Sequence, residues 1–206
     1  MLKSEVNVNG QVNRMATIKN MSDGSSFITF GLRVILPSRQ GENMTLDISV
    51  SMDGTDTSAI QLNGRIEIKG TLTFKKRGEA LYLNLHAQEI NTAPASNSDM
   101  LTGTLAFRGT IGKTVDDKTD KNGKPYKIYS GFSAEKVGEG FEYTWVRFVT
   151  FGENTQIQPK AKIEAAGELE LSQYNGKLNI SCRTSEVKEW VKPPYNPQSP
   201  KEELPF

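Results

Sequence analysis

Apolar and polar residues alternate along most of this 206-residue chain, and a two-residue period predicts β-strands with one buried face. No stretch keeps a 3.6-residue period, so we expect no long helix. Turn dipeptides such as Asp23-Gly24 and Asp53-Gly54 separate the alternating runs. The predicted strands are 25–36, 43–52, 64–74 and 80–90 in the first half, and 101–112, 125–135, 141–151, 161–171 and 176–187 in the second.

The second half repeats the first. The matched elements are Gly54 with Gly152, Gly70 with Gly167, Gly78 with Gly176, LNL (83–85) with LNI (178–180), and EI (89–90) with EV (186–187). About five strands per unit, with a short segment between the third and fourth, indicate an OB-fold barrel rather than two unrelated sandwiches. We therefore predict an all-β fold with two tandem five-stranded barrels. The predicted domains are 1–90 and 101–187, with a linker over 91–100 and an extended Pro-rich tail over 188–206.

Composition narrows the function classes. Cys182 is the only cysteine, so no internal disulfide can form and a reducing compartment is expected. His86 is the only histidine, which leaves no credible zinc set and no nearby nucleophile motif. We expect no enzyme, no metal and no cofactor. Neither an apolar run of roughly 20 residues nor a signal peptide is visible, so we expect a cytoplasmic protein without a membrane partner.

The segment FEYTWVRFVTF (141–151) is the most informative strand. Tyr143, Trp145, Arg147 and Phe151 fall on one face of it, and Val146 falls on the other. Aromatic rings offer flat faces for unpaired bases, and arginine supplies a phosphate contact. The pattern alone does not distinguish such a stacking face from an aromatic stripe in the barrel core.

At this point a family resemblance emerges. TWVRFVTFGE (144–153), KIEAAGELEL (162–171) and the terminal EELPF (202–206) resemble bacterial and phage single-stranded-DNA-binding proteins of the OB-fold type. The resemblance implies stacking roles for Trp145 and Phe151, a DNA contact for Arg147, and a further stacking position at Tyr174. The family's stacking aromatic at the end of the second strand has no clear match, with only Phe132 and Val137 nearby.

Charge adds few further candidates. Residues 101–187 hold 12 Lys and Arg against 11 Asp and Glu, so binding would depend on local placement. We predict contacts from Arg108, Lys162 and Lys177. The segment 113–127 is expected to be a long connection that closes over a bound strand. Its DDKTDKNG loosely echoes a calcium loop, but the terminal Glu is missing.

The first unit lacks the aromatic pattern. Matching the glycines places Asp47, Ser49 and Asp53 where the second unit has Trp145, Arg147 and Phe151. Carboxylates repel phosphates and serine cannot stack, so we expect no DNA binding by this surface. The cluster KKRG (75–78) is either a phosphate contact or an ordinary solvated hairpin.

The chain end carries the last motif. The resemblance implies that an acidic tip ending in Pro-Phe docks replication and repair proteins, here through Glu202, Glu203, Leu204, Pro205 and Phe206. It also implies four barrels per working unit, which a homodimer of this chain would supply. The predicted function is sequence-independent binding of single-stranded DNA in replication, recombination or repair, in a bacterial cell or encoded by a phage or mobile element. The alternatives are an RNA or oligonucleotide binder and a structural protein-interaction barrel.

Overall fold

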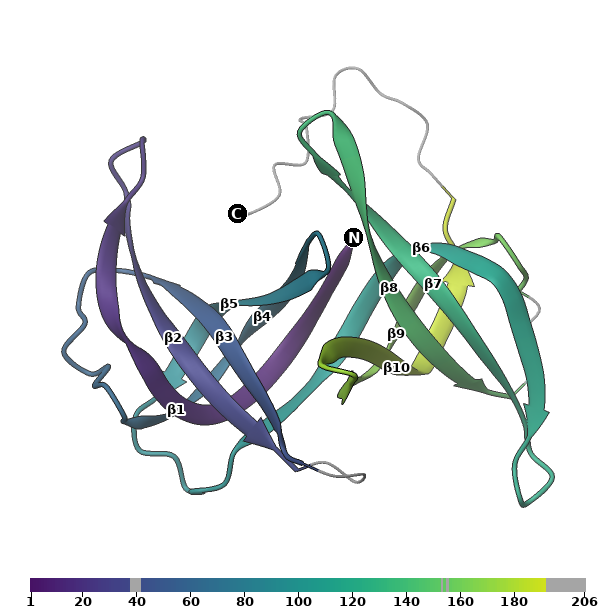
Figure 1. The fold of residues 1–206 in the computed structure, drawn as a ribbon, viewed down its shortest axis with the longest axis horizontal. Helices are drawn as coiled ribbons and strands as arrows, with labels where there is room; N and C mark the ends of the chain where they lie inside the picture. The colour runs from purple at the N-terminus through teal and green to yellow at the C-terminus, as the bar shows by residue number, and fades with distance from the viewer. Residues whose placement is uncertain (38–41, 153, 155, 192–206) are drawn as a thin grey trace.

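The computed structural model describes residues 1–37, 42–152, 154 and 156–191, and strands make up its regular structure (Figure 1). The first half contains β1 (Leu2–Asn20), β2 (Ser26–Leu36), β3 (Met44–Asp53), β4 (Arg65–Arg77) and β5 (Ala80–Asn91). The second half contains β6 (Met100–Thr119), β7 (Pro125–Val137), β8 (Gly140–Phe151), β9 (Lys162–Tyr174) and β10 (Lys177–Glu189). No helix that could cross a membrane occurs among the described residues.

Each half closes into a five-stranded barrel. In the first barrel the order is β1-β2-β3-β5-β4 with β4 returning to β1, and only β3 and β5 are parallel. The second barrel repeats this as β6-β7-β8-β10-β9, with β9 returning to β6 and β8 parallel to β10. This closure is the OB-fold arrangement. The predicted all-β fold with two tandem five-stranded barrels is confirmed.

The strands β1 and β6 each serve two neighbours because they bend. The β1–β2 register shifts between Val12 and Thr17, and the β6–β7 register shifts between Ile111 and Val115. Such irregularities increase local twist and let one strand close a barrel. The first halves of β1 and β6 also pair with each other, and this antiparallel pairing joins the two barrels into one sheet (Figure 1).

Alternation along the strands fills each barrel with apolar side chains. In the second barrel Phe148 is fully buried, with its ring centroid 4.8 Å from that of Phe107 and 5.1 Å from that of Tyr129. In the first barrel Phe30, Leu72 and Leu85 are equally inaccessible. Burying such a side chain stabilises the fold by about 1.5–3 kcal/mol relative to leaving it in water.

The segment 113–127 is not the long connection that we expected. Its ends continue β6 and β7 as a paired hairpin, with Asp117 beside Lys127 and Thr119 beside Pro125. The turn is closed by Asp120, whose Oδ1 accepts hydrogen bonds of 2.8 Å from the backbone N–H groups of both Asn122 and Lys124. The ladder explains the length of the segment, since these residues belong to strands.

The repeat alignment needs correction in the last hairpin. Gly70 and Gly167 are equivalent, but the turns pair Arg77 with Ala80 and Tyr174 with Lys177. Gly78 is therefore equivalent to Asn175, one residue before the expected Gly176. LNL (83–85) is likewise equivalent to 180–182 and not to LNI (178–180), because the parallel ladders pair Ile48 with Leu83 and Val146 with Ile180.

The segments outside the barrels are partly anchored. In the predicted linker, Asp99 accepts a 2.6 Å hydrogen bond from the backbone N–H of Ile35 and forms an ion pair with Arg65. The predicted tail over 188–206 begins later than expected, because β10 extends to Glu189 and the N–H of Trp190 bonds the carbonyl of Lys162. Most of the predicted tail lies outside the described residues.

Candidate nucleic-acid interface

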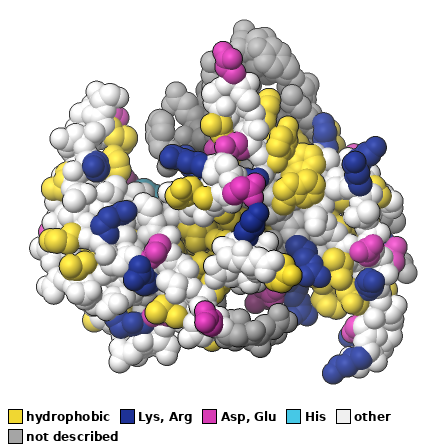
Figure 2. Space-filling model, in the orientation of Figure 1, with side chains coloured by type: hydrophobic (Ala, Val, Ile, Leu, Met, Phe, Trp, Pro, Cys, Tyr) yellow, Lys and Arg dark blue, Asp and Glu magenta, His cyan; other side chains and the backbone are white. Residues whose placement is uncertain are grey.

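The outer side of β8 carries a row of exposed aromatic side chains. This row is called the aromatic face below, and it consists of Phe141, Tyr143, Trp145, Arg147 and Phe151. The alternate residues Val146, Phe148 and Thr150 are buried in the barrel. Burial therefore excludes a position in the barrel core for these rings: Trp145 is 52% exposed, whereas Phe148 is 0% exposed. In Figure 2 hydrophobic side chains gather on the surface in this region of the second barrel.

A three-ring cluster forms one end of the aromatic face. Phe132 of β7 pairs with Trp145, and their ring centroids lie 5.1 Å apart. The ring of Tyr143 meets that of Phe132 edge-on at 5.4 Å. Trp145 also leans toward β6, where a Cβ built on Gly112 would come within 3.4 Å of the indole ring. The neighbours hold the indole in place while half of its surface stays open to a stacking partner.

A second cluster forms the other end. Phe151 stacks against Tyr126 of β7 with a centroid distance of 5.5 Å and an interplanar angle of 29°. The guanidinium carbon of Arg183, from β10, lies 5.0 Å from the centroid of Phe151. A cation over a ring is attracted to its π electrons, so Arg183 is positioned beside the face as an additional positive charge.

Arg147 lies between the two clusters. Its lateral neighbours are Ser130 on β7 and Ser181 on β10, both small side chains. Among the described residues, Arg147 makes no hydrogen bond or ion pair. A guanidinium that is exposed and has small neighbours can donate to a phosphate or stack on a base.

Tyr174 and Lys177 lie at the tip of the β9–β10 hairpin. They pair directly across the turn, and Tyr174 is 73% exposed. Lys177 is not a free cation, because its Nζ donates a 2.6 Å hydrogen bond to Oε2 of Glu79 in the first barrel.

Arg108 and Lys162 do not adjoin the aromatic face. They lie on β6 and β9, where each has its cationic group within 6 Å of the Trp190 ring centroid, at 5.6 Å and 5.9 Å. Arg108 is also paired with Glu164 at 2.8 Å, which reduces its charge toward a ligand. Lys162 does share a lateral row with Thr110, Phe132 and Trp145, three strands away or roughly 14 Å along the sheet.

Two buried groups behind the face have displaced pKa values. Burial raises the pKa of the Cys182 thiol to about 12. Burial likewise raises the pKa of Tyr129 to about 12, even though its hydroxyl is 3.1 Å from Oγ1 of Thr150. Both groups are therefore neutral at physiological pH and serve as core residues.

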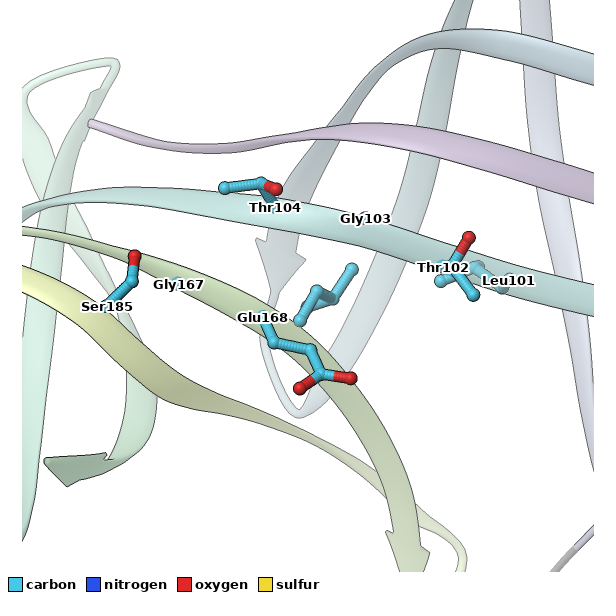
Figure 3. Close-up of a pocket in the computed structure, with 8 residues that line it drawn as sticks. Leu101, Thr102, Gly103, Thr104, Gly167, Glu168 and Ser185 are labelled. Atoms are coloured by element: carbon cyan, nitrogen blue, oxygen red, sulfur yellow. The ribbon is translucent and has the colours of Figure 1, made fainter. Parts of the chain in front are cut away.

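A shallow groove crosses β6, β9 and β10 (Figure 3). Its lining residues are Leu101, Thr102, Gly103, Thr104, Gly167, Glu168, Leu169 and Ser185. None of the aromatic residues described above contributes to it, and Glu168 adds a negative charge. The groove offers neither a stacking ring nor a cation, so it does not extend the interface. No group of three side chains suited to a metal ion occurs in the described part of the chain.

The first barrel presents a different surface at the equivalent position. Asp47 and Ser49 are exposed there, as predicted, and Ile48 is buried. Asp47 is paired with Arg33 of β2 at 3.0 Å and also accepts a 2.7 Å hydrogen bond from Asn13. The hydrogen bond and the charge of Asp47 raise the pKa of Arg33. Asp47, Arg33 and Asn13 thus form a polar network at the position where the second barrel has the exposed ring of Trp145.

The sequence pattern did not single out Tyr126 and Arg183, which complete the second cluster, or Trp190, which lies beside Arg108 and Lys162 away from the face. Phe132 was named only as a residue near the place of the family's second-strand aromatic, without a clear match, and the structure places its ring against Trp145 and Tyr143. The partner-binding tip, Glu202 to Phe206, lies outside the described residues.

Comparison with known proteins gives a consistent but distant similarity. The wild-type single-stranded DNA binding protein from Thermus aquaticus matches with 11% identity and a TM-score of 0.49, over 95% of this chain and 96% of that chain. A deletion mutant of the Thermus aquaticus protein matches with 11% identity and a TM-score of 0.46, over 97% of this chain and 98% of that chain. A murine DNA binding protein bound to double-stranded DNA matches with 8% identity and a TM-score of 0.28, over 92% and 99%. These values are too low to support an argument about function.

No family model matches the sequence, and no curated protein matches it either.

Proposed function

We propose that this protein binds single-stranded DNA along the aromatic face of its second barrel, without catalysis and without sequence preference. The observation that carries the proposal is the exposure of Trp145 and Phe151 on one strand, with Arg147 between them. Contact of large aromatic rings with water is unfavourable, so a ligand that covers them gains free energy. Unpaired bases are flat and can stack on such rings.

The geometry of the aromatic face favours a single strand of nucleic acid with any base sequence. From Phe141 to Phe151 the aromatic face extends ten residues, or about 33 Å along the strand. Each exposed ring can stack on any base, and stacking is worth roughly 1–3 kcal/mol per base. Base pairs in a duplex are already stacked on each other, so the face selects single strands.

The resemblance to single-stranded-DNA-binding proteins extends this proposal. The protein would protect unpaired DNA during replication, recombination or repair, and two chains would associate to give four barrels. Its C-terminal residues Glu202 to Phe206 would recruit partner enzymes. Sedimentation of the full chain tests the dimer, since a monomeric mass at working concentration would contradict it.

Tryptophan fluorescence tests the central proposal directly. The chain has two tryptophans, so the Trp190→Phe variant leaves only Trp145 as a reporter. Titration of this variant with oligo-dT should quench its emission strongly, because a base stacked on the indole quenches it. The matched variant Trp145→Ala retains only Trp190, and it should show weak quenching and at least about fivefold weaker binding.

Competition with oligonucleotides of the same sequence in DNA and RNA would distinguish the two nucleic acids. Absence of both quenching and binding at low salt would contradict the proposal. That result would favour the alternative in which the aromatic face contacts another protein.

A further inference from the structure

Two hairpin tips from different barrels meet at the inter-barrel tip, defined here as residues 75–82 with 174–177. Nζ of Lys177, in the second barrel, donates to Oε2 of Glu79, in the turn between β4 and β5, at 2.6 Å. The two side chains are 66% and 83% exposed. Figure 2 shows acidic and basic side chains together between the barrels. The contact is therefore a solvated ion pair that a competing anion can reach.

The first-barrel side of this tip combines a ring with cations. Tyr82 is 52% exposed, and the guanidinium carbon of Arg77 lies 5.8 Å from its ring centroid. Lys75 pairs laterally with Tyr82, so all three side chains share the outward side of the hairpin. Residues 75–82 hold three Lys and Arg against one Glu. The tip thus combines an exposed ring with cations, as the aromatic face combines its rings with Arg147 and with Arg183 of β10.

The second-barrel side of the tip is continuous with the aromatic face. Along β10 the outward residues run from Lys177 to Ser181 and Arg183, and the last two pair with Arg147 and Val149 of β8. Lys177 to Ser181 is four residues, or about 13 Å. A strand bound on β8 can thus pass over the outward side of β10 and arrive at Tyr174 and Lys177.

We propose that the inter-barrel tip is a second contact surface, on which bound single-stranded DNA continues from the second barrel onto the first. Tyr82 stacks a base there, and Lys75 and Arg77 contact phosphates. A phosphate takes the place of the Glu79 carboxylate on Lys177, an exchange that costs little because exposed ion pairs are weak. This inference rests on the proposed function. It gives the first barrel a role through its hairpin, although its β3 face is polar.

Oligonucleotide length separates the tip from the aromatic face. An OB-fold barrel covers roughly 4–16 nucleotides, so an oligomer of about 8 nucleotides can be held by the second barrel alone and one of about 30 can reach the tip. In the full chain, the triple variant Lys75→Ala, Arg77→Ala, Tyr82→Ala should weaken binding of the long oligo-dT by about tenfold. Its affinity for the short oligo-dT should stay within about twofold of wild type.

Two further variants complete the test. Lys19→Ala with Lys69→Ala removes two exposed cations of the first barrel outside the tip, and it should leave both affinities unchanged. Glu79→Gln frees Lys177 and should tighten binding of the long oligomer by about twofold or more, a gain that misfolding cannot produce.

An unchanged affinity of the triple variant for the long oligomer would overturn the inference, and so would an equal loss for both lengths. Either result would leave the proposed function standing if the wild type still binds the short oligomer. Failure of the wild-type chain to bind either length would overturn both.

Discussion

The two barrels of this chain have the same strand order and pairing, but they differ in the outward side chains that lie side by side on neighbouring strands. In the second barrel Phe132 lies beside Trp145, and in the first barrel Arg33 lies beside Asp47. The first pair is an exposed aromatic contact, while the second is an exposed ion pair. The barrel core is conserved in position between the units, so the surface can change without loss of the fold.

In this chain the residues that determine the fold are different from those that form the candidate site. Val146 and Ile48 are buried at equivalent positions, whereas their neighbours Trp145 and Asp47 face water. Inward residues are held by packing and outward residues are not. An OB-fold barrel alone therefore predicts no function, and the outward residues of β8 carry the proposal.

The largest effect on binding is expected when one ring is removed from each of the two clusters of the aromatic face. Trp145→Ala with Phe151→Ala deletes two stacking rings, which should weaken binding of oligo-dT by roughly 2–6 kcal/mol, or at least about thirtyfold. The matched variant Asp47→Ala with Asp53→Ala changes the equivalent positions of the first barrel and should not weaken binding. Fluorescence anisotropy with labelled oligo-dT measures both. Equal effects in the two barrels would contradict the asymmetry.

Alkaline stability should also distinguish the barrels. Folding raises the pKa of Cys182 from 9.0 to about 12 and that of Tyr129 from 10.0 to about 12. Below pH 9 both groups are neutral in the folded and the unfolded chain. As the pH rises toward 12 they ionise more easily in the unfolded chain, so the free energy of unfolding decreases. The contribution of Cys182 to this decrease in the free energy of unfolding should reach about 2 kcal/mol near pH 10.5.

The first barrel has the apolar residues Phe30 and Leu85 at the equivalent positions, so it lacks this sensitivity. Guanidinium unfolding at pH 7 and pH 10.5 measures the effect. Tyr129→Phe with Cys182→Ala should be less pH-dependent than wild type. An identical pH dependence in the two proteins would show that other groups cause the alkaline loss.

Transfer of the Phe132–Trp145 pair to the first barrel tests whether such a pair is sufficient to bind a base. Arg33→Phe with Asp47→Trp transfers the aromatic pair to the β2–β3 surface, at the expense of an exposed ion pair worth about 0–1 kcal/mol. One added stacking site should tighten binding of a long oligo-dT by about fivefold. Circular dichroism controls for folding. A folded variant without any gain would mean that stacking needs more than this pair.

The smallest effect is expected in the salt dependence. Arg147→Ala removes one proposed phosphate contact, so the slope of log affinity against log salt should become shallower by about 0.7. Arg33→Ala removes the guanidinium of the first-barrel ion pair and should leave the slope unchanged. Affinities measured from about 50 to 200 mM salt decide between them, and equal slopes in all three proteins would exclude a role for Arg147.

Most of the fold followed from the period of the sequence. Alternation placed nine strands, and their bounds were close to those observed except for β6, which extends to Thr119 instead of ending at residue 112. The tenth strand, β1, shows the same alternation at Val6, Val8 and Val12. It was missed because its second half bends and is largely exposed, so the apolar pattern fades after Val12.

The site was only partly predictable for a similar reason. Trp145, Arg147 and Phe151 could be grouped because they lie on one strand at even spacing. Tyr126, Phe132 and Arg183 join them from β7 and β10 through cross-strand register, and no local pattern specifies that register. The sequence also did not show which side of β8 faces water, because both sides are rich in apolar residues.

Photocrosslinking reports directly which residues contact the bound strand. Oligo-dT carrying 5-iodouracil bases can be bound to the full chain, irradiated, and mapped by mass spectrometry of the crosslinked peptides. We expect crosslinks at the aromatic residues of β8, above all at Trp145 and Phe151, and none on β3. Crosslinks confined to β3, or spread over the surface without enrichment on β8, would contradict it.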